Sequence, residues 1–133
     1  MRNDKENLIV NLTFEFALEI IEFTEELESA WKFVIANQIL KSGTSIGANV
    51  REAQNAESKN DFIHKFKIAA KEIEETKYWL LLCKHSNSYP DCSHIELQLL
   101  EIDKIRYDFY RKIPSPKTLV LTCLSWRSAR RFL

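Results

Sequence analysis

The chain has 133 residues, of which 45% are hydrophobic, and its formal net charge at pH 7 is zero. This length fits one compact domain with a buried core and excludes two domains of ordinary size. Two Gly and three Pro are too few for the tight turns of an all-β fold, whereas Glu, Lys, Leu, Ile and Ala are frequent, as in helical proteins. The expected fold class is all-α.

The sequence predicts no membrane segment, because it contains no run of 18 apolar residues. Its start lacks the basic stretch and apolar run of a signal peptide. Cys83, Cys92 and Cys123 make an odd number of cysteines, which favours reduced thiols over a disulfide framework. We therefore expect a cytoplasmic protein.

The charges are unevenly distributed along the chain. Residues 1–30 contain eight acidic and two basic side chains, whereas residues 109–133 contain six basic side chains and no acidic one. This asymmetry indicates that the two ends contact each other, within one chain or between chains, or that the tail binds a polyanion. The simpler alternative is a solvated acidic helix face and a disordered tail.

The first predicted helix is an amphipathic segment of about 18 residues that ends near Leu27. Glutamates lie beside its apolar stripe, which Ala17 and Ile21 widen. Ser29 is expected to cap the start of the next helix. The stripe consists of Leu12, Phe16, Ile20, Phe23 and Leu27.

The second predicted helix, over residues 31–57, contains both glycines of the chain, in the stretch KSGTSIGANVREA at residues 41–53. A glycine inside a helix costs about 1 kcal/mol relative to Ala, so two of them need a reason. We expect that they let another backbone approach closely, as in small-x-x-x-small ridges. The alternative is a kink or break near Gly43, where Ser42 and Ser45 can bond back to the main chain. The apolar rhythm continues through the glycines: Trp31, Val34, Ile35, Ile39, Gly43, Ile46, Val50 and Ala53.

The third predicted helix begins at a capping box formed by Ser58 and Asp61 and runs for about 26 residues. Trp79, Leu81 and Leu82 add apolar surface beyond one stripe, which favours contact with a partner subunit. The core stripe contains Phe62, Phe66, Ala69, Ile73, Thr76, Leu80 and Cys83. The residues expected to make helix-packing or oligomer contacts are Gly43, Ser45, Ile46, Gly47, Asn49 and Trp79.

A fourth helix follows the turn residues at 85–93 and is expected to end before Pro114 and Pro116. Its apolar positions include Ile95, Leu99, Ile102 and Phe109. Four helices with short connections predict an antiparallel up-down-up-down four-helix bundle over residues 1–113. Residues 114–133 are expected to form a separate basic C-terminal tail, whose segment TLVLTCLSW fits no further bundle position.

Residues 40–85 resemble the bacterial four-helix-bundle family of ribosomal-RNA intervening-sequence proteins. The likeness rests on the S-I-G-A-N segment at residues 45–49, on Glu52 and Ala53, and on the K-x-D-F pattern at residues 59–62. It extends more loosely over residues 8–105, and the sequence departs from the family after Ile105. The resemblance implies a ring-shaped homopentamer. It also implies kinship with the accessory protein of diversity-generating retroelements, which binds nucleic acid and a reverse transcriptase.

Two functions follow as hypotheses. The first is a non-enzymatic structural or adaptor protein that assembles as a homo-oligomeric ring. The second is an accessory protein that binds RNA or DNA phosphates through basic side chains of the second and third helices. These side chains are Lys41, Arg51, Lys59, Lys65, Lys67 and Lys71.

No cofactor, metal site or catalytic arrangement is expected. Cys83 and His85, with Cys92 and His94, form two C-x-H pairs, but their spacing is unlike that of zinc fingers. Two Asp-x-x-His pairs, which begin at Asp61 and Asp91, resemble di-iron ligands, but they lie at helix starts where capping explains the aspartates. The G-T-S-I-G segment lacks the lysine and the preceding strand of a phosphate-binding loop.

Overall fold

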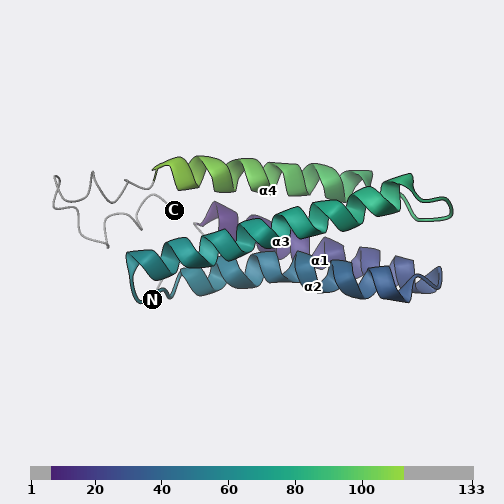
Figure 1. Ribbon diagram of the computed structural model, residues 1–133, viewed down its shortest axis with the longest axis horizontal. Coiled ribbons are helices and arrows are strands. Elements are labelled where there is room, and N and C mark those ends of the chain that lie inside the picture. The colour runs from purple at the N-terminus through teal and green to yellow at the C-terminus, as the bar shows by residue number, and fades with distance from the viewer. Residues whose placement is uncertain (1–6, 113–133) are drawn as a thin grey trace.

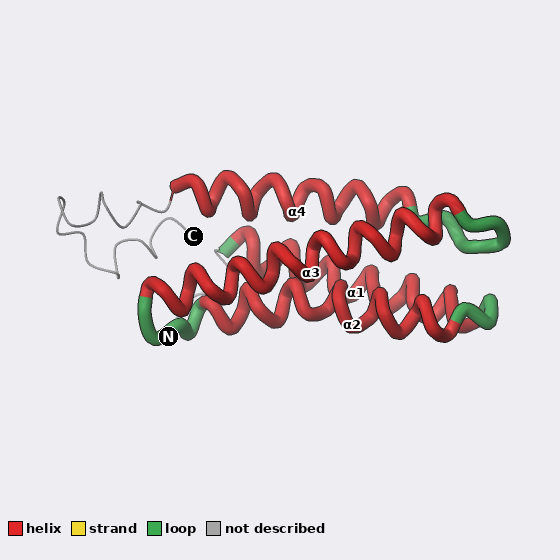
Figure 2. The backbone as a smooth tube through the Cα atoms, in the orientation of Figure 1, coloured by secondary structure: helices red, strands yellow, loops and turns green. Residues whose placement is uncertain are grey.

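The computed structural model describes residues 7–112, which form four α-helices and no strand. The helices are α1 (Leu8–Ser29), α2 (Phe33–Ala53), α3 (Lys59–His85) and α4 (Ser93–Lys112). Their short connections lie at alternate ends of the molecule, so successive helices run in opposite directions (Figures 1 and 2). The predicted four-helix bundle is confirmed. The expected tail at residues 114–133 lies outside the described residues.

Side-chain caps fix the starts of α1 and α3. The Asn7 side chain accepts a hydrogen bond from the Val10 amide at the start of α1. At the start of α3, the Ser58 hydroxyl accepts a hydrogen bond from the Asp61 amide at 3.1 Å. Asp61 in turn accepts one from the Glu57 amide, also at 3.1 Å. The serine half of the predicted capping box is thereby confirmed, whereas the Asp61 carboxylate binds the Glu57 amide instead of the Ser58 amide.

Ser29 does not cap α2, contrary to the prediction. It is the last residue of α1, and its hydroxyl donates to the Glu25 carbonyl. The chain then turns through Trp31, whose φ of 63° lies in the left-handed region. The amides of Trp31 and Lys32 each donate at 2.9 Å to carbonyls in the last turn of α1, which is the Schellman pattern of helix termination. Because this turn takes up residues 30–32, α2 begins at Phe33 without a side-chain cap.

The core runs along the bundle axis, and each helix contributes one buried stripe. At one end the rings of Phe62, Phe66 and Phe109 cluster, with centroids 4.8 to 5.8 Å apart. Trp31 and Val34, which were expected on the apolar side of α2, are instead exposed. The largest fully buried side chains include Phe16, Ile20, Leu27, Ile39, Ile46, Phe66, Ile73, Leu80, Ile95 and Leu99.

The two glycines face α1. The helix α2 is continuous through both of them, so the alternative of a break at Gly43 is wrong, and α2 ends at Ala53 rather than near residue 57. A Cβ at Gly43 would lie 2.8 Å from Cγ1 of Ile20. One at Gly47 would lie 3.1 Å from the Thr13 carbonyl oxygen. The small residues therefore let α1 and α2 of the same chain approach each other closely.

The fourth helix packs less tightly than the other three. α2 makes extensive contact with α1 and α3, whereas α4 makes sparser contact with both of its neighbours. Figure 1 shows α4 set apart from α2. Small side chains line α2, and a buried hydrogen bond of 2.9 Å joins Thr76 to Ser42 across α2 and α3. Bulky side chains such as Ile95 and Leu99 keep α4 further away.

Candidate interaction surface between α3 and α4

A groove with a volume of about 620 Å³ lies between the second half of α3 and the first half of α4. Its floor includes the buried Leu80 and Leu99. Its walls carry exposed apolar side chains, among which Leu97 is 68% exposed and Leu100 is 56% exposed. Tyr78 and Leu81 complete these walls. Exposed apolar side chains gathered around one concave surface are typical of a protein contact surface.

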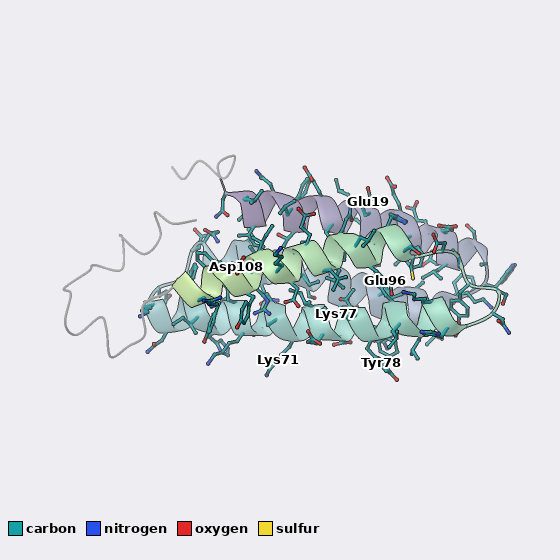
Figure 3. The ribbon with its side chains drawn as sticks, turned by 90° about the horizontal axis from the view of Figure 1, so that it is seen from above. Glu19, Lys71, Lys77, Tyr78, Glu96 and Asp108 are labelled. Atoms are coloured by element: carbon teal, nitrogen blue, oxygen red, sulfur yellow. The ribbon has the colours of Figure 1, made fainter. Side chains whose placement is uncertain are left out.

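Ion pairs join the two helices beside the groove. Lys77 bonds Asp103 at 2.6 Å and Glu74 at 2.9 Å, and Lys84 bonds Glu96 at 3.0 Å. In Figure 3, Lys77 and Glu96 lie between α3 and α4, whereas Tyr78 points outward from α3. These pairs replace apolar packing along this edge of the bundle, so the groove has an apolar interior and a charged border.

Asp103 takes part in the shortest of these ion pairs. Burial tends to raise its pKa, but hydrogen bonds from Lys77 and Arg106 outweigh that effect and hold the pKa of Asp103 below its ordinary value. The Arg106 guanidinium donates to the other carboxylate oxygen at 2.6 and 3.0 Å. Asp103 therefore stays ionised at neutral pH and fixes α4 against α3.

A second exposed apolar surface lies at the corner between α1 and α2. Trp31 is 82% exposed, and its ring packs edge-on against Phe33, which is itself half exposed. Lys32 bridges this corner to the α3–α4 turn, where its ammonium lies 4.8 Å from the centroid of the Tyr89 ring. Sequence periodicity assigned Trp31 and Val34 to the core, so it missed this surface.

The predicted packing residues do not gather at the groove. Gly43 and Gly47 face α1 of the same chain, and Ile46 is fully buried. Ser45 donates to the Lys41 carbonyl and Asn49 to the Ser45 carbonyl, so both bond back to α2. Trp79 packs partly against the core, and its indole donates to Glu75. Their part in an assembly stays a prediction. Of the apolar surplus predicted on α3, Leu81 lines the groove, while Leu82 is exposed outside it.

The predicted phosphate-binding side chains do not share one face. Lys67 and Lys71 are exposed one turn apart on α3, and Lys71 points outward in Figure 3. Lys65 instead bonds Glu52 at 2.7 Å, which neutralises it. Lys41 and Arg51 are exposed on α2, but ten residues apart, about 15 Å along the helix. Lys59 lies at the first turn of α3. RNA or DNA binding stays a prediction.

The thiols and the imidazoles of the two C-x-H pairs lie in different surroundings. Cys83 and Cys92 are buried, and burial raises the pKa of the Cys83 thiol to about 11. His64, His85 and His94 are exposed. His94 approaches Glu19 of α1 at 3.7 Å. Within residues 7–112, no three potential ligands of the His, Cys, Asp or Glu type converge. No helix in that range is long and apolar enough to cross a membrane.

Comparison with known proteins places the chain in a family. The family model of the 23S rRNA-intervening sequence protein matches residues 5–107. A comparison with curated proteins finds no match. Among solved structures, the chain is similar to a protein of unknown function from the S23 ribosomal protein family of Bacteroides thetaiotaomicron VPI-5482, solved at 1.70 Å. The two are 40% identical with a TM-score of 0.74, and the match covers 77% of this chain and 98% of that chain. The chain therefore belongs to the 23S rRNA-intervening sequence protein family.

Proposed function

We propose that this protein is a non-enzymatic structural or adaptor protein that assembles as a homo-oligomeric ring, with five copies as the expected number. The observation that carries the proposal is the α3–α4 groove, whose walls expose Leu81, Leu97 and Leu100 to solvent. Burial of such a side chain contributes about 1.5 to 3 kcal/mol. A second chain that covers several of these side chains therefore gains a substantial free energy of association.

A second copy is the occupant that the exposed surfaces favour. The groove lies on α3 and α4, whereas the corner of Trp31, Phe33 and Val34 belongs to the α1–α2 turn. A contact between two different surfaces of identical chains is head-to-tail, and it closes into a ring when the rotation between copies fits. The expected number of five comes from the family resemblance.

The charged border of the groove also suits a protein partner. Lys77 and Lys84 of α3 pair with Asp103 and Glu96 of α4, and Lys77 also pairs with Glu74 of its own helix, so the border carries both signs rather than a positive field. Nucleic-acid phosphates bind best to clustered cations without neighbouring carboxylates. This pairing favours assembly over the accessory role in nucleic-acid binding, and no contact within residues 7–112 points to a reverse transcriptase as partner.

Charge placed on the groove walls tests the proposal. The double variant Leu97→Lys/Leu100→Lys changes two exposed side chains, so the fold of one chain should survive while the contact is lost. Size-exclusion chromatography with light scattering is expected to show a fall from the assembled mass to 15.7 kDa. The control Tyr107→Lys alters an exposed side chain of α4 outside the groove and should leave the mass unchanged. An unchanged mass in the double variant would refute the role of the groove.

A further inference from the structure

The outer face of α1 carries a second stripe, separate from its core stripe. Phe14, Leu18 and Ile21 are 54%, 47% and 40% exposed. Glu25 and Glu28 continue the stripe at the same intervals of four and three residues, and both are exposed. The stripe is therefore apolar in its first part and acidic in its last part.

A hollow of about 170 Å³ lies beside the apolar part of this stripe, between α1 and α2. Phe14 and Ala17 line it from α1, and Thr44, Gly47, Ala48 and Arg51 line it from α2. Because Gly47 and Ala48 have little or no side chain, the hollow reaches close to the backbone between Thr44 and Arg51. It offers space for an apolar side chain from a segment that lies along α1.

The C-terminal segment of the chain has the same order of chemistry. Residues 119–126 read LVLTCLSW and contain no charge. Arg127, Arg130 and Arg131 follow, and residues 113–133 contain no acidic side chain. Along the chain, the segment is therefore apolar in its first part and basic in its last part. This order complements the stripe on α1, which is apolar in its first part and acidic in its last part.

The end of α4 is suitably placed for this contact, and the C-terminal segment is long enough to make it. α4 ends at the end of the bundle where α1 begins, so the segment can follow α1 in the same direction (Figure 1). From Phe14 to Glu28 the helix extends about 21 Å. The 13 residues from Leu119 to Arg131 reach up to about 40 Å when extended. The family match ends at residue 107, so this segment lies beyond the part shared with the family.

Charge distinguishes this surface from the groove as a binding site for the segment. The groove is lined by Lys77 and Lys84 together with Glu74 and Glu96, so its charges balance and offer a basic segment no net attraction. The sequence of α1 contains no basic residue, and Glu22 flanks the acidic part of the stripe.

We propose that residues 119–131 dock on the outer face of α1 of their own chain, with the apolar part over Phe14, Leu18 and Ile21 and the arginines beside Glu25 and Glu28. The contact is independent of the groove, so it does not rest on the proposed ring. In this proposal the acidic face of α1 and the basic C-terminal segment of the chain bind each other.

Photo-crosslinking in the full chain tests this contact. Leu121→p-benzoylphenylalanine places a photoreactive group in the apolar part of the segment. Mass spectrometry is expected to find the crosslink in residues 10–21 of α1 or residues 44–48 of α2. A mixture of isotope-labelled and unlabelled chains separates crosslinks within one chain from those between copies. A crosslink to the α3–α4 groove, a crosslink between copies, or no crosslink would overturn the proposal.

Charge reversal tests the electrostatic part. Glu22→Lys/Glu25→Lys/Glu28→Lys is expected to lower the crosslink yield about fivefold to tenfold, since three exposed ion pairs are lost. Arg127→Glu/Arg130→Glu/Arg131→Glu in the same chain should restore the yield. The control Glu57→Lys/Glu75→Lys/Glu101→Lys makes the same charge change on other exposed positions and should have little effect. Failure of the restoring variant, or an equal loss in the control, would refute the pairing.

Discussion

Gly43 provides the sharpest test of why α2 contains glycine in its interior. Three side-chain atoms of Ile20 lie within 2.8 to 3.0 Å of the position that a Cβ would take. Ile20 is fully buried, so it has no solvent into which it can move. In an unconstrained helix, Gly→Ala stabilises by about 0.5 to 1 kcal/mol. Here the added methyl group overpacks the core, which costs about 1 to 3 kcal/mol. We expect Gly43→Ala to lower the free energy of unfolding by about 1 to 2 kcal/mol.

Removal of the Ile20 side chain should reverse the sign of this effect. In an Ile20→Ala background the methyl group meets open space, so Gly43→Ala should stabilise by about 1 kcal/mol. The coupling free energy of the double-mutant cycle is then about 2 to 3 kcal/mol. Ile20→Ala alone costs about 2 to 5 kcal/mol, which a domain stable by about 5 to 15 kcal/mol can tolerate.

Urea unfolding followed by far-UV circular dichroism measures all four corners of the cycle. The protein concentration must be equal in each experiment, because assembly adds to the apparent stability. Asn37→Ala, on an exposed position of α2, calibrates the gain in helix propensity without a packing change. If Gly43→Ala stabilised the wild-type chain as much as Asn37→Ala does, or if the cycle showed no coupling, the argument from close approach would be wrong.

Two further predictions concern charge and backbone conformation. Asp103→Asn should lower the free energy of unfolding by about 1 to 2 kcal/mol, because Lys77 and Arg106 lose their anionic partner. Since the pKa of Asp103 is lowered in the folded state, its contribution is present above the unfolded pKa of about 3.9 and is lost as the pH falls through the folded pKa. Denaturant titrations should therefore show a constant difference between wild type and variant from about pH 5 to 7 and a shrinking one below about pH 4; a difference unchanged at low pH would contradict this. Ser88→Gly should raise the free energy of unfolding by about 0.5 to 1 kcal/mol, because relief of its left-handed φ of 64° exceeds the entropy that glycine adds to the unfolded chain. Ala30→Gly, where φ is −91°, should instead be destabilising, and equal effects at the two positions would refute the reasoning.

Apolar periodicity was enough to predict the helices and most of the core. The predicted stripe of α3, from Phe62 to Cys83, is buried throughout, because a long amphipathic helix has only one face that can be removed from water. The start of α2 was predicted less well. Trp31 and Val34 match the apolar period, but the turn that ends α1 sets the rotation of α2 and places both side chains in solvent. Such a turn depends on backbone geometry that apolar spacing does not encode.

The groove could not be located from the sequence. An excess of apolar residues on α3 indicated a contact surface, and Leu81 does line the groove. Leu97 and Leu100, however, have the same residue type as the buried Leu99. Which leucines stay exposed depends on the distance and rotation of α4 relative to α3, and these depend on the packing of all four helices. For the same reason, the sequence alone did not show that Lys65 is paired with Glu52.

The mass of the full chain in solution tests assembly most directly. Sedimentation equilibrium over a wide range of protein concentration gives this mass without reference to shape. The account predicts a single species of five times 15.7 kDa that persists on dilution through the micromolar range. A species of 15.7 kDa at every concentration would contradict it, because the groove walls would then remain in water with no second copy to cover them.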